Sequence, residues 1–183
     1  PYRRQRQMCI RDRCARTGKS TADVAVIPLP DFKQKMVQIG YLARTANLLG
    51  IATPKIACIA PSEQLLPNVI SSTEGALLAK MADRGQLGNV VVDGPLSLDV
   101  ALYKEVAEHK KVKGSSVAGD PDCLLFPNLE SANVFFKSVS HLCGGELAAM
   151  VMGTKVPCVL TSRGDTSKTK LFSIALACLA VKK

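Results

Sequence analysis

Residues 156–165 read VPCVLTSRGD, and this stretch decides the fold class. The apolar run VPCVL ends abruptly in the small, polar and charged residues TSRGD, and a helical pattern follows. Residues 90–95, VVVDGP, show the same arrangement earlier in the chain. In α/β proteins a buried strand ends in this way, with functional groups at its carboxyl end. The sequence therefore predicts an α/β fold with its chemistry at the strand ends.

The remaining chain alternates in the same manner. Apolar runs typical of buried strands occupy residues 22–28, 54–60, 89–93, 123–127, 146–153 and 156–161. Helical spacing of apolar residues fills the intervals, at about 31–49, 71–84, 97–110, 130–143 and 167–181. Continuous apolar strands that alternate with helices are typical of a parallel-type sheet with helices on both faces. We expect no internal repeat, and we interpret residues 113–120 (KGSSVAGD) as a loop.

Local signals place several helix ends. Asp31, after Pro30, is a candidate N-cap, and Gly50 stands where a helix that starts there would end. Ser71 and Glu74 have the S-x-x-E spacing of a capping box, and Gly85 would end that helix.

The composition is that of a soluble globular protein. The chain has 183 residues, 47% hydrophobic and 21% charged, and contains no apolar run long enough to span a bilayer. We expect a cytoplasmic protein with no membrane partner.

The net charge of +9 is concentrated in residues 1–16, which hold six Arg and one Asp. A basic arm that binds nucleic acid is one interpretation, but no basic patch interleaved with aromatics supports it elsewhere. Because RQMCIRDR resembles translated adaptor sequence, we interpret residues 1–16 as non-native and leave them out of the fold prediction.

The seven cysteines form no Cys-x-x-Cys pair. Three of them, Cys58, Cys158 and Cys178, lie within apolar runs, which favours buried free thiols in a reducing cytosol over disulfides. No cluster of His, Cys and carboxylates has the spacing of metal ligands, so we expect no metal.

Ser162 and Arg163 are the strongest candidates for chemistry. A hydroxyl, a guanidinium and helix N–H groups at one point suit an anion such as phosphate, although a capping hydroxyl beside a solvated Arg remains an alternative. Asp93 ends a strand, where it would cap the loop or face a cleft; we weigh both equally. Asn133 and Lys137 lie one turn apart on one helix face.

Four segments together resemble one family, the phosphate acetyl/butyryltransferases, in order and spacing. They read NVISSTEGALLAKMADRG (68–85), VVVDGPLSLDVA (90–101), VAGDPDCLLFPNLESANVFFK (117–137) and MGTKVPCVLTSRGD (152–165). The motifs GPLSLD, AGDPD and LTSRGD are more similar to the butyryl branch, and the resemblance covers about residues 17–181. It implies reversible acyl transfer from acyl-CoA to phosphate, which gives acyl phosphate and CoA. It also implies a two-domain fold like that of isocitrate and isopropylmalate dehydrogenases, with the active site in the interdomain cleft.

The resemblance also implies roles for individual residues. Arg163 would hold phosphate or the acyl phosphate, and Ser162 would hydrogen-bond the developing negative charge. Asp93, Asn133 and Lys137 match positions that line or support the cleft. Coenzyme A and phosphate would be substrates, with no permanently bound cofactor, and the family suggests a homodimer or larger assembly.

Two positions depart from the acetyl branch. That branch has an Asp seven residues after the motif Ser, where this chain has Thr169, so Asp165 becomes the candidate base for the CoA thiol. It also has an Arg on the preceding helix, at a place that corresponds to Ser140. Both departures fit the butyryl branch, with phosphate acetyltransferase as the alternative.

The family chain is longer than this one. We therefore expect a C-terminal portion with a truncated first domain: residues 17–30 are its remnant, residues 31–150 form the second α/β domain, and residues 151–183 return to the first domain as a strand and a helix. Such a returning piece should expose apolar surface. More distant alternatives are an inactive fragment and a metal-dependent decarboxylating dehydrogenase.

Overall fold

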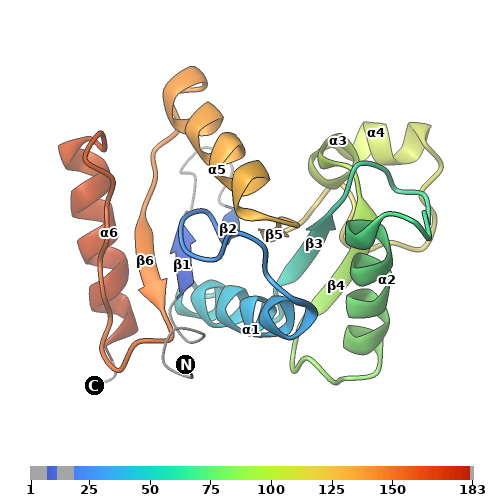
Figure 1. The fold of residues 1–183 in the computed structure, drawn as a ribbon, viewed down its shortest axis with the longest axis horizontal. Coiled ribbons are helices and arrows are strands. Elements are labelled where there is room, and N and C mark those ends of the chain that lie inside the picture. The colour runs from blue at the N-terminus through green and yellow to red at the C-terminus, as the bar shows by residue number, and fades with distance from the viewer. Residues whose placement is uncertain (1–7, 12–18, 182–183) are drawn as a thin grey trace.

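The computed structural model describes residues 8–11 and 19–181. Its strands form one six-stranded sheet in the order β4-β3-β5-β2-β1-β6 (Figure 1). The strands are β1 (Met8–Arg11), β2 (Ser20–Ala22), β3 (Lys55–Ile59), β4 (Val91–Leu96), β5 (Cys123–Leu125) and β6 (Ala149–Met152). The helices are α1 (Phe32–Leu48), α2 (Ile70–Asp83), α3 (Leu98–Leu102), α4 (Lys104–His109), α5 (Leu129–Lys137), the π-helical turn η2 (Ser138–Leu142) and α6 (Ser167–Ala180).

Strand direction confirms the parallel-type sheet for most of the molecule. β4, β3, β5 and β2 pair in parallel, whereas β1 is antiparallel to both β2 and β6. β5 lies between β3 and β2. The connection after β3 leads to β4 at one edge of the sheet, whereas the connection after β5 leads to β6 at the opposite edge. Such a switch point is where open α/β sheets bind their ligands.

Helices cover both faces of the sheet, as predicted. One core packs α1, α2 and α6 against the sheet and includes Ile39, Leu78 and Leu176. The other packs α3, α4 and α5 on the opposite face, with Val100, Ala107 and Phe136 among its buried residues. Alternate residues of β3 and β5 enter the two cores, because successive side chains of a strand point to opposite faces.

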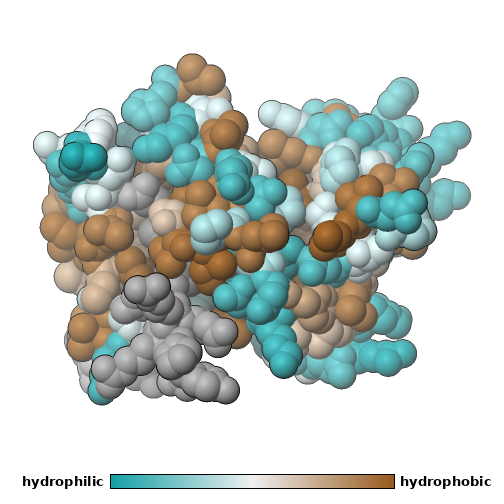
Figure 2. All heavy atoms as spheres, in the orientation of Figure 1, coloured by the Kyte–Doolittle hydropathy of each residue, from teal (hydrophilic) through white to brown (hydrophobic). Residues whose placement is uncertain are grey.

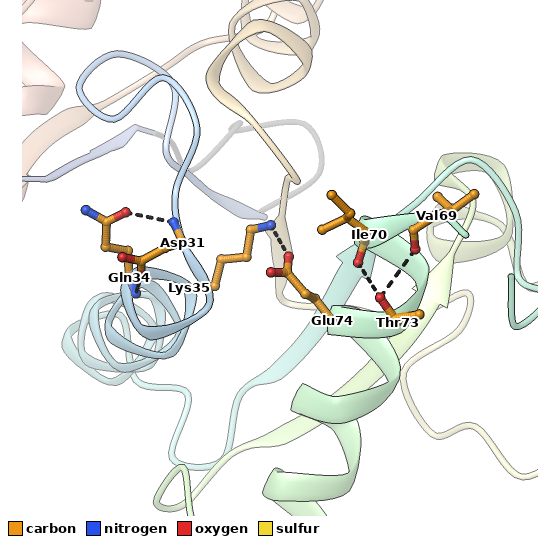
Figure 3. Close-up of polar contacts among 7 residues, drawn as sticks. All are labelled: Asp31, Gln34, Lys35, Val69, Ile70, Thr73 and Glu74. Atoms are coloured by element: carbon orange, nitrogen blue, oxygen red, sulfur yellow. Dashed lines mark hydrogen bonds and ion pairs between the residues drawn. The ribbon is translucent and has the colours of Figure 1, made fainter. Parts of the chain in front are cut away.

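The predicted ends of α1 and the end of α2 are confirmed. The Asp31 carboxylate accepts a hydrogen bond from the Gln34 backbone N–H at 2.7 Å, and the Gln34 amide oxygen accepts one from the Asp31 N–H at 2.7 Å (Figure 3). Gly50 and Gly85 follow the last residues of α1 and α2 with φ of 89° and 72°, a conformation that glycine adopts without strain.

The capping box predicted at Ser71 and Glu74 is wrong. α2 begins one residue earlier, at Ile70, and its N-cap residue Val69 makes no side-chain hydrogen bond. The Glu74 carboxylate instead forms an ion pair with the Lys35 ammonium of α1 (Figure 3). Glu74 therefore bonds to a residue of α1 instead of to the backbone at the start of its own helix.

The strand predicted over 22–28 ends at its first residue, Ala22. The Asp23 carboxylate then accepts three backbone hydrogen bonds, from the N–H groups of Ala25, Val26 and Ile27 at 3.0, 3.1 and 2.9 Å. A side chain that bonds the backbone a few residues ahead competes with a sheet ladder, and here it turns the chain out of the sheet.

Two further elements differ from the prediction. The run 156–161 is not a strand: it contributes one antiparallel bridge, between Cys158 and Val151, and Pro157 lacks the N–H that a ladder requires. The helix predicted over 97–110 divides into α3 and α4 at Tyr103, whose backbone is extended.

The remaining outcomes concern residues 8–11 and the thiols. Although we left residues 1–16 out of the fold prediction, Met8–Arg11 form β1 between β2 and β6. In the described part of the chain no disulfide involves Cys58, Cys123, Cys143, Cys158 or Cys178. Burial is confirmed for Cys58, but Cys158 is only partly buried and Cys178 is exposed. Across the described residues, none of the helices combines the length and apolar character that a membrane span requires.

Candidate active site

The residues Ser162 to Asp165 form a closed turn. The Asp165 backbone N–H donates to the Ser162 carbonyl at 3.1 Å, and the Ser162 N–H donates to Asp165 Oδ2 at 2.6 Å. Arg163 and Gly164 lie exposed between these two anchors. The turn thus holds a guanidinium-bearing residue at its tip, with the Ser162 and Asp165 side chains at its base.

The turn leads directly into α6. Thr166 is the N-cap residue, and its hydroxyl accepts a hydrogen bond from the Thr169 N–H at 3.2 Å. A helix N-terminus carries partial positive charge, because its first N–H groups have no partners within the helix. Arg163 and the start of α6 therefore bring positive character to the same stretch of chain.

A cavity of about 360 Å³ adjoins this turn. One wall comes from residues 140–147 and the other from residues 164–169; the lining side chains include Ser140, His141, Glu146, Asp165, Thr166, Lys168 and Thr169. The Lys168 ammonium pairs with the Glu146 carboxylate across these walls. Asp165 thus lines a cavity together with the N-terminal turn of α6.

Asn133 and Lys137 lie on α5, away from that turn. The Asn133 side-chain amide donates to the Val24 carbonyl oxygen at 2.9 Å, which ties α5 to the loop after β2. The Lys137 ammonium lies 5.2 Å from the centre of the Phe136 ring, a cation–π geometry. Ser140 and His141 of η2, a few residues further, reach the cavity described above.

Asp93 lies at the other end of the sheet. It belongs to β4, the strand furthest from β6, and its Oδ1 accepts from the Gly94 N–H at 2.8 Å. The prediction that Asp93 ends its strand is wrong, because β4 continues through Gly94 and Pro95 to Leu96 and the bond lies within the strand. Burial raises the pKa of the Cys58 thiol to about 12, and the nearby charge of Asp93 adds to the effect. The described part of the chain therefore brings Ser162, Arg163 and Asp165 together but leaves Asp93 apart.

Sequence reasoning missed an apolar groove of about 650 Å³ at the switch point. Its walls come from the carboxyl ends of β3 and β5, the start of α3 and one face of α5; its residues are Ile59, Ala60, Pro61, Leu98, Phe126, Pro127, Glu130, Ser131, Val134, Phe135 and Ser138. The Phe126 and Phe135 rings lie 5.1 Å apart between centroids. No local sequence signal marks this groove, because its walls come from segments that are distant in the chain.

The described residues contain no group of three or more His, Cys, Asp or Glu side chains placed to hold a metal ion. The cavity residues Thr166 and Lys168 were also missed from the sequence. Only Thr166 carried a local signal there, as a hydroxyl residue immediately before a helix.

Comparison with known proteins shows the family to which the chain belongs. Residues 8–178 match the family described as "Phosphate acetyl/butaryl transferase". Phosphate butyryltransferase of Clostridium acetobutylicum is 43% identical over 157 residues, which are 86% of this chain and 52% of that protein. Phosphate acetyltransferase of Thermotoga maritima is 38% identical over 179 residues, with 88% and 60% of the two chains covered.

Among solved structures, a branched-chain phosphotransacylase from Enterococcus faecalis V583 superposes with a TM-score of 0.82 at 29% identity, over 94% of this chain and 62% of that one. The chain thus spans about half to three-fifths of the length of these relatives. The resemblance found in the sequence motifs is confirmed, and the chain belongs to the phosphate acetyl/butaryl transferase family.

Proposed function

We propose that this chain carries part of the active site of a phosphate acyltransferase, which exchanges an acyl group between coenzyme A and inorganic phosphate. The observation that carries the proposal is the Ser162–Asp165 turn beside the N-terminus of α6, in a chain that matches this family. Butyryl is the favoured acyl group, because the chain is 43% identical to two proteins named phosphate butyryltransferase.

The chemistry needs a held anion and a stabilised oxyanion. A phosphate oxygen attacks the thioester carbonyl carbon; the new C–O bond forms, the C–S bond breaks, and CoA leaves as the thiolate. The planar guanidinium of Arg163 offers paired N–H donors to phosphate, and the N-terminus of α6 adds its partial charge. The Ser162 hydroxyl would donate to the negative charge that develops on the carbonyl oxygen.

In the reverse direction the thiol of CoA must lose its proton. Two carboxylates line the cavity, Asp165 and Glu146, and Glu146 is paired with Lys168. We assign Asp165 as the acceptor of this proton, because it belongs to the same turn as Ser162 and Arg163 and lines the cavity.

The acyl-CoA substrate would extend toward α5. The apolar groove suits the uncharged part of acyl-CoA, and Lys137, adjacent to its lining residue Ser138, would attract the CoA phosphates. Asn133 would keep α5 in place, and Asp93 would face the cleft from β4. The proposal also includes a two-domain architecture like that of isocitrate and isopropylmalate dehydrogenases. Residues 17–30 and 151–183 would belong to one domain and residues 31–150 to the other. The protein would be cytoplasmic and would form a homodimer or a larger assembly.

The test is release of free CoA thiol from butyryl-CoA and from acetyl-CoA, with and without phosphate. We expect phosphate-dependent release, which Arg163→Ala lowers at least a hundredfold and Arg84→Ala, an exposed Arg just after α2, leaves unchanged. Faster release from acetyl-CoA would favour phosphate acetyltransferase, the activity named for the Thermotoga maritima relative. If the rate of CoA thiol release does not depend on phosphate, or if Arg163→Ala does not lower it, the proposed role of the turn is refuted.

A further inference from the structure

The proposed reaction transfers a proton as well as an acyl group. When hydrogen phosphate attacks acyl-CoA, it loses its proton as the acyl phosphate forms, and the CoA sulfur gains one as it leaves. Asp165, assigned above to the sulfur, serves only one end of this transfer. The other end requires an acid–base group within reach of the phosphate, so a second titratable residue is expected in the same cavity.

His141 is a residue of the chemical type that this role requires. The chain has two histidines, and of these His141 lines the cavity of about 360 Å³ together with Asp165, whereas His109 lies on α4. An unperturbed imidazole titrates at about pH 6.5, against about pH 4 for a carboxylate. An imidazole therefore exchanges a proton with phosphate readily near neutral pH, where a carboxylate does so poorly.

A π-helical turn holds His141 at the cavity. The turn η2 continues α5 directly, and the Cys143 N–H donates to the Ser138 carbonyl at 3.1 Å, across five residues. The Ser140 hydroxyl donates to the Lys137 carbonyl at 3.1 Å. π-helical turns are rare and occur frequently at functional sites. Ser140 and His141 of this turn both line the cavity, and His141 is exposed to solvent, with which it can exchange protons.

The wall opposite η2 is suited to phosphate. It consists of residues 164–169, the end of the candidate turn and the start of α6, where helix N–H groups favour an anion. The charged groups around the imidazole are Asp165, Lys168 and Glu146 in the cavity, of which the last two pair with each other, and Lys137 one turn earlier. Figures 1 and 2 show the end of α5 and the start of α6 at the same margin of the molecule, where hydrophilic surface is visible. Phosphate held at this wall would face η2 across the cavity.

We propose that His141 is the acid–base group for phosphate, a role that rests on the proposed acyltransferase function. The imidazole accepts the proton of hydrogen phosphate while the new C–O bond forms and the C–S bond breaks, and protonated Asp165 gives its proton to the sulfur. Exchange with solvent then returns one proton from His141 to Asp165, so that the number of bound protons is unchanged after a turnover. In the reverse direction the imidazolium protonates the phosphate that leaves.

The first test removes the imidazole and then supplies it from solution. His141→Gln keeps a polar side chain but cannot exchange a proton, so kcat for phosphate-dependent release of CoA thiol should fall about a hundredfold, with KM for butyryl-CoA nearly unchanged. Imidazole added to the buffer should restore much of the lost rate, which a merely structural role would not allow. His109→Gln, on α4, is the matched control and should leave the rate unchanged.

The second test does not depend on turnover. The ring signals of the two histidines are followed by NMR while inorganic phosphate is added to the 183-residue chain, with sodium chloride of equal ionic strength as the control. We expect the signals of His141 to shift progressively with phosphate and those of His109 to stay in place. Arg163→Ala should abolish the shift, because the anion is then no longer held beside the cavity.

Two results would overturn the inference. One is phosphate-dependent release that Arg163→Ala lowers and His141→Gln leaves unchanged, in which case the proposed function stands without His141. The other is a His141 signal that phosphate moves no more than that of His109. If phosphate shifts the His141 signals but no release occurs, the proposed function fails for this chain, while the contact between His141 and phosphate is supported.

Discussion

Asp23 shows how one side chain can end a strand. Its carboxylate is 3% exposed and accepts three backbone hydrogen bonds, yet burial raises the pKa of Asp23 above its usual value because desolvation outweighs those bonds. The residue therefore shapes the loop that Asn133 ties to α5, at some cost when it is ionised.

Replacing Asp23 with Asn should lower the free energy of unfolding by about 2 kcal/mol. The side-chain NH₂ group of Asn is a donor, so it would face either the Ile27 N–H or the N–H groups of Ala25 and Val26 and could not accept a hydrogen bond from them. The difference from wild type should be largest below the usual carboxyl pKa of 3.8 and should shrink as the pH rises through the raised pKa. The sign follows because the native state holds this proton more tightly than the unfolded chain does. Urea unfolding of both proteins between about pH 3 and pH 7 measures the difference, in which other titrating groups cancel. A difference that widens with pH would mean that hydrogen bonding outweighs burial.

Local contacts within the candidate site could be predicted from the sequence, and distant ones could not. Ser162 and Asp165 are three residues apart, so a turn necessarily brings them close. The walls of the cavity come from residues 140–147 and 164–169, and no local signal joins those segments. The position of Asp93 depends on which strand becomes the edge of the sheet, which is a property of the whole topology.

Helices α1 and α2 are linked by a buried ion pair. The Lys35 and Glu74 side chains are 6% and 19% exposed, and each comes from the first two turns of its helix (Figure 3). Removal of one partner from such a pair leaves a buried charge without compensation, whereas replacement of both by apolar groups is often tolerated.

We therefore expect Lys35→Met to destabilise the protein by about 3 kcal/mol, and the double variant Lys35→Met/Glu74→Leu to recover most of that loss. The exposed pair Lys80–Asp83, with side chains 62% and 63% exposed, provides the control: Lys80→Ala should change stability by less than about 1 kcal/mol. Denaturant unfolding of the single and double variants gives the coupling energy. Additive single effects would show that the two side chains do not interact.

At the level of elements, three of the signals at helix ends succeeded, whereas the capping box at Ser71 and Glu74 did not. Asp31, Gly50 and Gly85 act through neighbouring backbone groups, so the sequence alone locates them. The run 156–161 has the composition of a strand, but an apolar run forms a ladder only if a partner strand lies beside it. Here the described chain offers only the single bridge to Val151.

The molecule as a whole protects two of its thiols. Cys58 and Cys123 are buried on β3 and β5, and burial raises the pKa of each to about 12, whereas Cys143 and Cys178 are exposed. Reactivity of the buried pair therefore reports global opening of the sheet.

Under native conditions, iodoacetamide should modify Cys143 and Cys178 within minutes and leave Cys58 and Cys123 unmodified for far longer. At about pH 9 Cys58 and Cys123 should still remain unmodified, because thiols with a pKa near 12 are protonated there. Addition of denaturant should make all four react, as peptide mass spectrometry would show. Rapid native labelling of Cys58 would mean that the α2 side of the sheet opens readily.

The position of β5 has a consequence for synthesis on the ribosome. β3, α2 and β4 are consecutive in the chain and pack on one another, so they can assemble as soon as they emerge. β2 is made earlier, but its parallel neighbour is β5, which emerges only after about a hundred further residues. Until then β2 and β3 lack the strand that lies between them in the sheet, so the backbone N–H and C=O groups along those two edges have no strand partner. We therefore expect chaperones that recognise extended apolar segments to bind the nascent chain before β5 is made.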